Sequence, residues 1–143
     1  MAITKTQLAI FMDKHIVPHT PSLKGTDGAI RLATNKAWYK DFGSYIILRS
    51  YDTNVAIFVK RTGTLVVRDR YSTTTAQHVT SFISELEHMR DCAMMRVTYL
   101  YRRSDRVIER GWRGMDSMYK LTLRDYKQVK ANDFMGYIPD PER

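Results

Sequence analysis

The residues whose types and spacing could support catalysis form a cluster of hydroxyls and a histidine between positions 72 and 78. Ser72, Thr73 and Thr75 stand just before His78, where a helix is predicted to begin. A histidine beside the N–H groups of a helix N-terminus could act as a general base or bind an anion. The alternative is a half-buried histidine that packs beside Phe82 one turn later, with the hydroxyls capping the helix and the helix dipole favouring the neutral imidazole. We favour this packing interpretation.

A second pattern, Glu85-x-x-His88, has the spacing that di-metal helix bundles use. Those proteins carry the motif twice, with further glutamates from other helices, and this chain has one copy. The single cysteine, Cys92, excludes a cysteine-based metal site and an internal disulfide. No phosphate-binding glycine loop and no Gly-x-Ser-x-Gly motif occurs. We therefore expect no metal and no cofactor, and we do not expect an enzyme.

The strongest functional signal is a basic, aromatic segment from Arg96 to Arg113. Six arginines against two acidic residues give it a local charge of +4, and two tyrosines and a tryptophan are interleaved with them. Guanidinium groups match phosphate geometry, and they stack on bases as aromatic rings do. Trp112 is expected at a hairpin tip; in the alternative it folds back onto the sheet and the arginines form a solvated rim. The candidate residues for binding nucleic acid or another partner are Arg68, Arg70, Arg96, Tyr99, Tyr101, Arg102, Arg103, Arg106, Arg110, Trp112 and Arg113.

Length and composition set the frame for these residues. The chain has 143 residues, 43% hydrophobic and 27% charged, which is typical of one globular domain with its own core. No apolar run reaches the roughly 18 residues of a membrane helix, and no signal peptide is predicted. The net charge of +8 and the pI near 9.7 favour nucleic acid, acidic proteins or anionic surfaces as partners. We expect an intracellular protein with no membrane contact.

The first third of the chain begins with a predicted amphipathic helix over Thr4–Ile16. Thr4 and Gln7 have the spacing of a capping box. Pro18 ends this helix, and a glycine-containing loop follows to about position 28. Residues 29–42 are ambiguous between strand and helix, so the pattern does not assign them.

The middle third has the clearest periodicity. Three apolar, β-branched runs, Tyr45–Tyr51, Val55–Lys60 and Thr64–Arg68, are separated by short turns that suit hairpins. Connections this short exclude parallel crossovers and predict an antiparallel meander. A helix from about Thr74 to Asp91 is predicted to follow, capped by Thr74 and packed on one face of the sheet.

The last third is predicted to hold a strand over Met94–Arg103 and then a hairpin. Its strands are Val107–Glu109 and Met118–Leu121, joined through positions 111–114. A short helix is expected from Thr122 to about Ala131, and a tail from Gly136. The predicted fold class is α+β: an antiparallel meander sheet with helices packed on one side. The single domain divides into an N-terminal helix and loop (1–43), sheet and central helix (44–91), basic hairpin and C-terminal helix (92–135), and tail (136–143).

The stretch Tyr71–His78 follows the predicted hairpins and opens the central helix. It resembles the Tyr-Ser-x-Thr-Thr-x-x-His pattern of an uncharacterised domain family of small proteins from bacteriophages and other mobile elements, over about Tyr45–Met89. The resemblance implies an accessory protein of a phage or mobile element, acting in the cytoplasm of a bacterial host. Some small proteins in that setting inhibit host defences such as CRISPR effectors, and others serve replication or packaging.

Three functions are compatible with these patterns. The leading hypothesis is a non-enzymatic phage or mobile-element protein that binds nucleic acid or a nucleoprotein complex, with a CRISPR effector as one candidate, through the Arg96–Arg113 segment. The second is a protein–protein interaction module or homo-oligomer that docks an acidic protein. The third is an enzyme that acts near His78. The sequence leaves the oligomeric state open.

Overall fold

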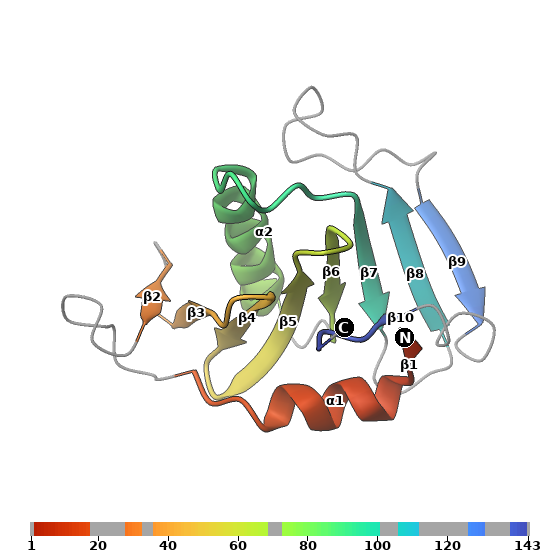
Figure 1. The fold of residues 1–143 in the computed structure, drawn as a ribbon, viewed down its shortest axis with the longest axis horizontal. Coiled ribbons are helices and arrows are strands. Elements are labelled where there is room, and N and C mark those ends of the chain that lie inside the picture. The colour runs from red at the N-terminus through yellow and green to blue at the C-terminus, as the bar shows by residue number, and fades with distance from the viewer. Residues whose placement is uncertain are drawn as a thin grey trace.

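The computed structural model describes residues 2–17, 28–32, 36–68, 73–100, 106–111, 126–130 and 138–142 (Figure 1). The elements in chain order are β1 (Ala2–Ile3), α1 (Lys5–Asp13), β2 (Ala29–Arg31), β3 (Ala37–Asp41), β4 (Tyr45–Ser50), β5 (Thr53–Val59), β6 (Thr64–Val67), α2 (Thr73–Glu87), β7 (Arg96–Leu100), β8 (Arg106–Gly111), β9 (Tyr126–Lys130) and β10 (Ile138–Pro139). The α+β class is confirmed. Neither helix of the described ranges has the length and apolar character needed to cross a membrane.

The main sheet has eight strands, whose spatial order β2 to β9 follows the chain. Neighbouring strands are antiparallel except β6 and β7, which are parallel. The three strands predicted in the middle of the chain are confirmed as β4, β5 and β6. The prediction of a strict meander is wrong at one position, because α2 connects β6 to β7 as a helical crossover. Such a crossover returns the chain to the edge at which β6 began, so β7 runs in the same direction.

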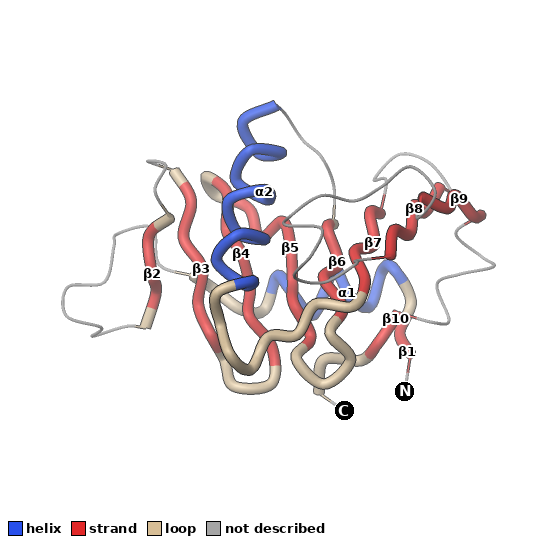
Figure 2. Tube along the Cα trace, turned by 90° about the horizontal axis from the view of Figure 1, so that it is seen from above, coloured by secondary structure: helices blue, strands red, loops and turns tan. Residues whose placement is uncertain are grey.

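The two helices cover opposite faces of the sheet, so the prediction that they pack on one side is wrong. In Figure 1 α2 lies above the sheet and α1 below it, and Figure 2 shows α2 in front of the strands and α1 behind them. Along β4, Ile46 and Leu48 pack in the α2 core, whereas Ile47 packs in the α1 core. A sheet that is apolar on both faces needs a covering layer on each side. Strands β4 to β6 are buried at nearly every position. A continuous apolar run of this kind is typical of strands whose sheet is covered on both faces.

Helix α1 begins as the sequence predicts. The Thr4 hydroxyl accepts from the Gln7 backbone N–H, and the Gln7 side chain accepts from the Thr4 N–H, so the capping box is confirmed. Leu8 and Met12 are the buried positions of this short helix. The buried amide of Asn54, from β5, donates to the carbonyls of Met12 and His15, which satisfies acceptors at the helix C-terminus.

Helix α2 is confirmed, with boundaries that differ from the prediction. It begins at Thr73, so Thr74 lies in its first turn and does not cap it, and it ends at Glu87, four residues before Asp91. The buried stripe of the helix is the predicted apolar one, with Val79 and Phe82 among its members. The ambiguous segment 29–42 forms the two strands β2 and β3.

The last third of the chain differs most from expectation. β8 is confirmed as a strand, but its partner is β9, and β9 occupies the region predicted as a helix from Thr122 to Ala131. The predicted partner strand Met118–Leu121 and the hairpin tip at 112–114 lie outside the described residues. The predicted tail contains β10, which pairs with β1 at the other end of the chain.

The turn between β5 and β6 fixes where β7 begins. Gly63 has a φ of +66°, and a Cβ built on it would lie 2.4 Å from the Ala93 carbonyl oxygen. Its own carbonyl accepts from the backbone N–H groups of Met95 at 2.8 Å and Arg96 at 3.2 Å. Only glycine tolerates both the positive φ and the close backbone approach.

Candidate nucleic-acid interface

Strands β7, β8 and β9 form the end of the sheet opposite β2, beyond α2 (Figure 1). β8 is the central strand of this group and pairs antiparallel with both neighbours. Its Arg110 stands opposite Val97 of β7 and Tyr126 of β9, and its Arg106 stands opposite Lys130. Directly opposed residues lie on the same face of a sheet, and successive residues alternate between faces.

The register therefore separates two sets of positions. One face holds Arg106, Arg110, Lys130, Tyr99 and Tyr126, together with Val97, Ile108 and Gln128, and we call the first five positions the basic face. Because Val97 shares this face and is buried in the α2 core, the basic face is on the α2 side of the sheet. The opposite, α1-side set mixes charges and apolar residues: Arg96, Thr98, Leu100, Val107, Glu109, Gly111, Lys127 and Val129.

Three of the eleven candidate binding residues come together on the basic face: Tyr99, Arg106 and Arg110. Six others lie outside the described residues: Arg70, Tyr101, Arg102, Arg103, Trp112 and Arg113. The remaining two, Arg68 and Arg96, are described and lie elsewhere.

Arg68 belongs to the α1 side of the molecule. Its guanidinium makes a two-pronged ion pair with Asp13 of α1, with N–O distances of 2.6 and 3.2 Å. Arg96 is half-buried at the start of β7, at a register position on the face opposite Arg106 and Arg110. The structure thus does not group Arg68 and Arg96 with the arginines of β8.

Two members of the basic face, Tyr126 and Lys130, were missed by sequence reasoning. The sequence predicts a helix for this segment because Thr122 resembles a helix N-cap residue. The signal that could have found them was weak and compositional: the segment holds Tyr126 and the β-branched Val129, residue types that are enriched in strands, but their spacing of three does not alternate.

A polar pocket of about 360 Å³ lies on the α1 side, where α1 ends beside the β4–β5 turn and the end of β6. Arg68 and Asp13 form one wall of this pocket. Arg49 contributes a second guanidinium, whose Nη1 donates to the Asn54 side-chain oxygen at 3.4 Å. The lining residues are Asp13, Ile16, Arg49, Asp52, Thr53, Asn54 and Arg68.

His78 is buried, with 1% of its surface exposed. Its Nδ1 is 2.7 Å from the hydroxyl of Ser50, at the end of β4, and that hydroxyl is 3.2 Å from the hydroxyl of Thr75. Burial lowers the pKa of His78 and so favours the neutral ring. The ring of Tyr51, which has a positive φ of 54°, lies against it with centroids 5.6 Å apart. This geometry agrees with a packed, neutral His78, but the ring is fully buried and not half-buried, and it is hydrogen-bonded to Ser50, a partner that the packing interpretation did not include.

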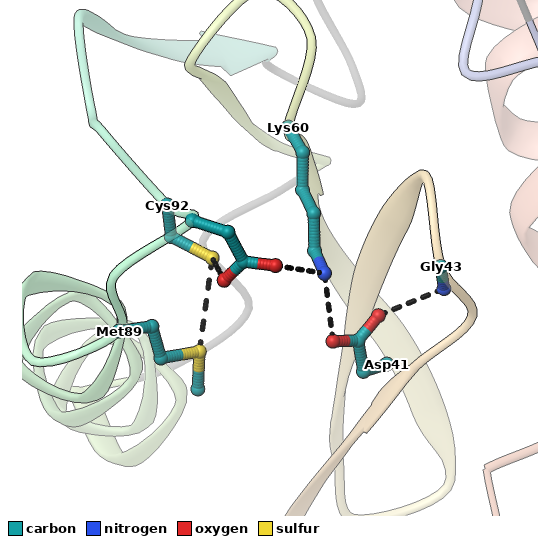
Figure 3. Close-up of polar contacts among 6 residues, drawn as sticks. Asp41, Gly43, Lys60, Met89 and Cys92 are labelled. Carbon is teal, nitrogen blue, oxygen red and sulfur yellow. Dashed lines mark hydrogen bonds and ion pairs between the residues drawn. The ribbon is translucent and has the colours of Figure 1, made fainter.

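An ion-pair cluster ties three connections of the sheet together (Figure 3). The Lys60 ammonium, after β5, donates at 2.8 Å to both Asp41 at the end of β3 and Asp91 after α2. Asp41 also accepts from the Gly43 N–H at 2.8 Å. Burial by itself lowers the pKa of Lys60, but the hydrogen bonds to the two carboxylates outweigh it and raise the pKa to about 12. The Lys60 ammonium thus bridges two carboxylates and links the connections after β3, β5 and α2, so we assign the cluster a structural role.

Cys92 borders this cluster and is buried. Its thiol donates weakly to Asp91 at 3.5 Å and to the Met89 sulfur at 3.7 Å (Figure 3). Burial and the adjacent Asp91 carboxylate raise the pKa of Cys92 to about 12. A thiol of this kind is protonated at neutral pH and is a poor nucleophile.

The histidines do not assemble into a metal site within the described residues. No group of three or more histidine, cysteine, aspartate or glutamate side chains there is arranged to hold an ion. His88 of the Glu85-x-x-His88 motif donates from Nδ1 to the Ser84 carbonyl at 2.7 Å. His15 shares a 3.0 Å hydrogen bond with Tyr45 inside a ring cluster with Phe11 and Phe42.

Comparison with known proteins gives one result. No curated protein and no solved structure matches the chain. A family model described as a family of unknown function (DUF8033) matches residues 15–96, which is more than half of the chain. The match begins two residues after α1, runs through the α2 crossover and ends at the first residue of β7. It therefore covers the ion-pair cluster and the pocket lining except Asp13, and it ends before β8 and β9. The chain belongs to this family of unknown function, DUF8033.

Proposed function

We propose that this is a non-enzymatic binding protein that contacts nucleic acid through the basic face. The observation that carries the proposal is the strand register. Two arginines, a lysine and two tyrosines from three adjacent strands share one face of the sheet, with no acidic position among the described members of that face. Arg110 and Arg106 belong to the same strand, four residues apart, which corresponds to about 13 Å at ~3.3 Å per residue.

The chemistry of these residue types suits a polyanion with bases. Lysine and arginine neutralise phosphates and release counterions, and this gives affinity without sequence preference. Tyrosine rings on a sheet offer surfaces for base stacking, worth about 1–3 kcal/mol per base. The charge of +8 on the whole chain adds a long-range attraction of the same sign. Nucleic acid therefore fits the set better than an acidic protein, which would not use stacking.

The biological setting is part of the proposal and comes from the resemblance of Tyr71–His78 to a phage and mobile-element pattern. In that setting the nucleic acid is free or belongs to a nucleoprotein, such as a CRISPR effector with its guide RNA. The protein would then act as a host-defence inhibitor that grips nucleic acid, and not as an acidic mimic of DNA.

The test is fluorescence anisotropy of the nuclease-treated protein with labelled single- and double-stranded DNA and RNA across a salt series. Two double variants remove two positive charges each, from opposite faces of the β7–β9 group: Arg106→Gln with Arg110→Gln in β8 on the basic face, and Arg96→Gln in β7 with Lys127→Gln in β9 on the other. We expect micromolar or tighter binding for the unmodified chain. The basic-face pair should weaken it and reduce the salt slope by about 0.7–0.9 for each phosphate that the variant no longer neutralises.

Equal effects of the two pairs would show that only net charge matters and would overturn the assignment to the basic face. No binding at physiological salt would overturn the nucleic-acid proposal and favour an acidic protein partner. That alternative has its own test, because a protein complex captured from host lysate survives nuclease treatment and a nucleic-acid complex does not.

A further inference from the structure

The strand register arranges the positions of the basic face in rows. Residues of β7, β8 and β9 that stand directly opposite one another form one row, and successive rows on the same side are two residues apart. From β7 to β9 the rows are Val97, Arg110 and Tyr126, then Tyr99, Ile108 and Gln128, and then Arg106 with Lys130 in β8 and β9. The register thus places two aromatic positions among three positive ones, and no acidic residue occupies the described positions on this side of the three strands.

The two tyrosine positions, Tyr99 and Tyr126, stand diagonally across β8. They are two strands apart, about 9.6 Å, and one row apart, about 6.7 Å, because strands are ~4.8 Å apart and each residue advances ~3.3–3.4 Å. The diagonal between their backbone positions is therefore about 12 Å. This distance is more than three times the ~3.4 Å between neighbouring nucleotides along one strand of a duplex. In such a stack both faces of every interior base are covered by its neighbours, so rings at these positions could stack only on bases that have left the stack.

A base-paired duplex does not fit this arrangement. It presents only the edges of its bases, in grooves, and the major groove, about 12 Å wide, admits an α-helix or a two-stranded ribbon. The basic face is neither, because β7 continues into β6 and the rest of an eight-stranded sheet. A duplex laid on this face would meet the positive positions with its phosphates and leave both tyrosine positions unused.

A single strand, by contrast, can use every member of the basic face. Unpaired bases can be splayed out and stacked on aromatic side chains while the backbone follows positive charge. Arg110 stands on one side of the tyrosine diagonal, and Arg106 and Lys130 stand on the other. Phosphates on either side of two stacked bases would therefore meet a positive position.

We propose that the basic face binds single-stranded nucleic acid, with Tyr99 and Tyr126 each stacking on one base of the same strand. The inference rests on the proposed function and narrows it, since that function requires only a nucleic acid of some kind. DNA and RNA share the chemistry that is recognised, which is an unpaired base beside a phosphate.

The first experiment is fluorescence anisotropy with oligothymidine, oligouridine and a DNA duplex, each labelled and about 12 nucleotides long, within the ~4–16 that single-strand binding folds cover. We expect a single strand to bind at least about tenfold more tightly than the duplex, because each stacked base adds about 5- to 150-fold. Tighter binding of either the DNA or the RNA single strand supports the proposal. Equal binding of single strands and duplex would overturn it.

Tyrosine variants assign this preference to the two positions. Tyr99→Leu and Tyr126→Leu keep an apolar side chain and remove the ring, so each should weaken single-strand binding by about 5- to 150-fold. Duplex binding and the salt slope should not change, because stacking releases no counterions. Tyr99→Phe and Tyr126→Phe keep the ring and should bind as the unmodified chain does. The matched control is Tyr51→Leu, which removes an exposed ring from the β4–β5 turn and should leave binding unchanged.

A crosslinking experiment tests the same positions in the unmodified chain and so does not depend on the folding of a variant. Oligothymidine is prepared with 5-iodouracil in place of some thymines, because this base crosslinks on irradiation to an aromatic side chain on which it stacks. Peptide mass spectrometry should then find the crosslinks at Tyr99 and Tyr126. Crosslinks confined to other residues would overturn the proposal.

The results separate failure of this inference from failure of the proposed function. If no nucleic acid binds at physiological salt, both are wrong. If the variant Arg106→Gln with Arg110→Gln weakens binding but the folded Tyr99→Leu and Tyr126→Leu variants do not, the basic face still binds nucleic acid and the single-strand inference alone is wrong. Circular dichroism and thermal melting check that each variant is folded.

Discussion

Replacing Gly63 with alanine tests the turn that positions β7. The new Cβ would lie 2.4 Å from the Ala93 carbonyl oxygen and 3.2 Å from the Met95 nitrogen, whereas Cβ atoms essentially never come closer than 3.0 Å to such atoms. The gap must therefore open by at least 0.6 Å, the difference between 3.0 and 2.4 Å. Both contacts are backbone atoms, so no side-chain rotation relieves them.

Three contributions set the magnitude for Gly63→Ala. An L-residue at φ +66° costs about 1–2 kcal/mol. Forcing the two backbone segments apart costs about 1–3 kcal/mol, as for overpacking elsewhere in a core. The shift also stretches the bonds from Met95 and Arg96 to the Gly63 carbonyl, each worth about 1 kcal/mol. We expect the free energy of unfolding to fall by about 3–5 kcal/mol.

Urea unfolding followed by circular dichroism measures this change, and Gly43→Ala is the matched control. Gly43 also has a positive φ, of 101°, but a Cβ there would meet nothing within 4 Å. It should therefore lose only the conformational contribution, about 1–2 kcal/mol. Equal losses in the two variants, within about 0.5 kcal/mol, would refute the claim that backbone contact with the segment leading into β7 requires glycine.

Three further predictions concern single residues. Burial lowers the pKa of His78 below 6.5, so its contribution to stability is complete above pH 6.5 and is lost as the pH falls below that value. In urea unfolding from pH 7.5 to 5, the free energy of unfolding should fall by up to about 1.4 kcal/mol per pH unit. This fall should be smaller in His78→Gln. Cys92, buried and with a pKa near 12, should react with Ellman's reagent at pH 8 at least about 100-fold more slowly in the native protein than in urea, and comparable rates would contradict its burial. Thr4→Ala removes the cap of α1 and should cost about 1 kcal/mol in urea unfolding, with Thr6→Ala, at an exposed position in the same helix, as the control that should change stability less.

The parts of the fold that sequence reasoning predicted are those set by local physics. The capping box of Thr4 and Gln7 depends on residues three apart, and the strands β4, β5 and β6 on short turns between β-branched runs. The stripe of α2 repeats every three or four residues and was visible for the same reason. Local signals of this kind do not depend on how distant segments pack.

The errors arose where distant segments decide the structure. β9 forms because β8 offers it a hydrogen-bonding edge, which overrides the weak helix start at Thr122. The bond between Ser50 and His78 joins residues 28 positions apart, so no spacing rule near His78 could have indicated it. Arg68 was grouped with the other arginines by charge alone, and its partner Asp13 is 55 positions away.

The pairing of β1 with β10 has a consequence for the order of folding. Ala2 pairs with Pro139, so these two residues close a loop of 137 positions, the difference between 139 and 2. Joining the ends of an unstructured chain of that length costs roughly 4 kcal/mol of entropy, which a two-residue ladder does not recover by itself. The ends can meet only after the large sheet has shortened the path between them. We therefore expect the β1–β10 ladder to form last on folding and to open first on unfolding. The hydrogen bond from Arg61 to the Asp140 carbonyl, at 3.1 Å, should form and break with it.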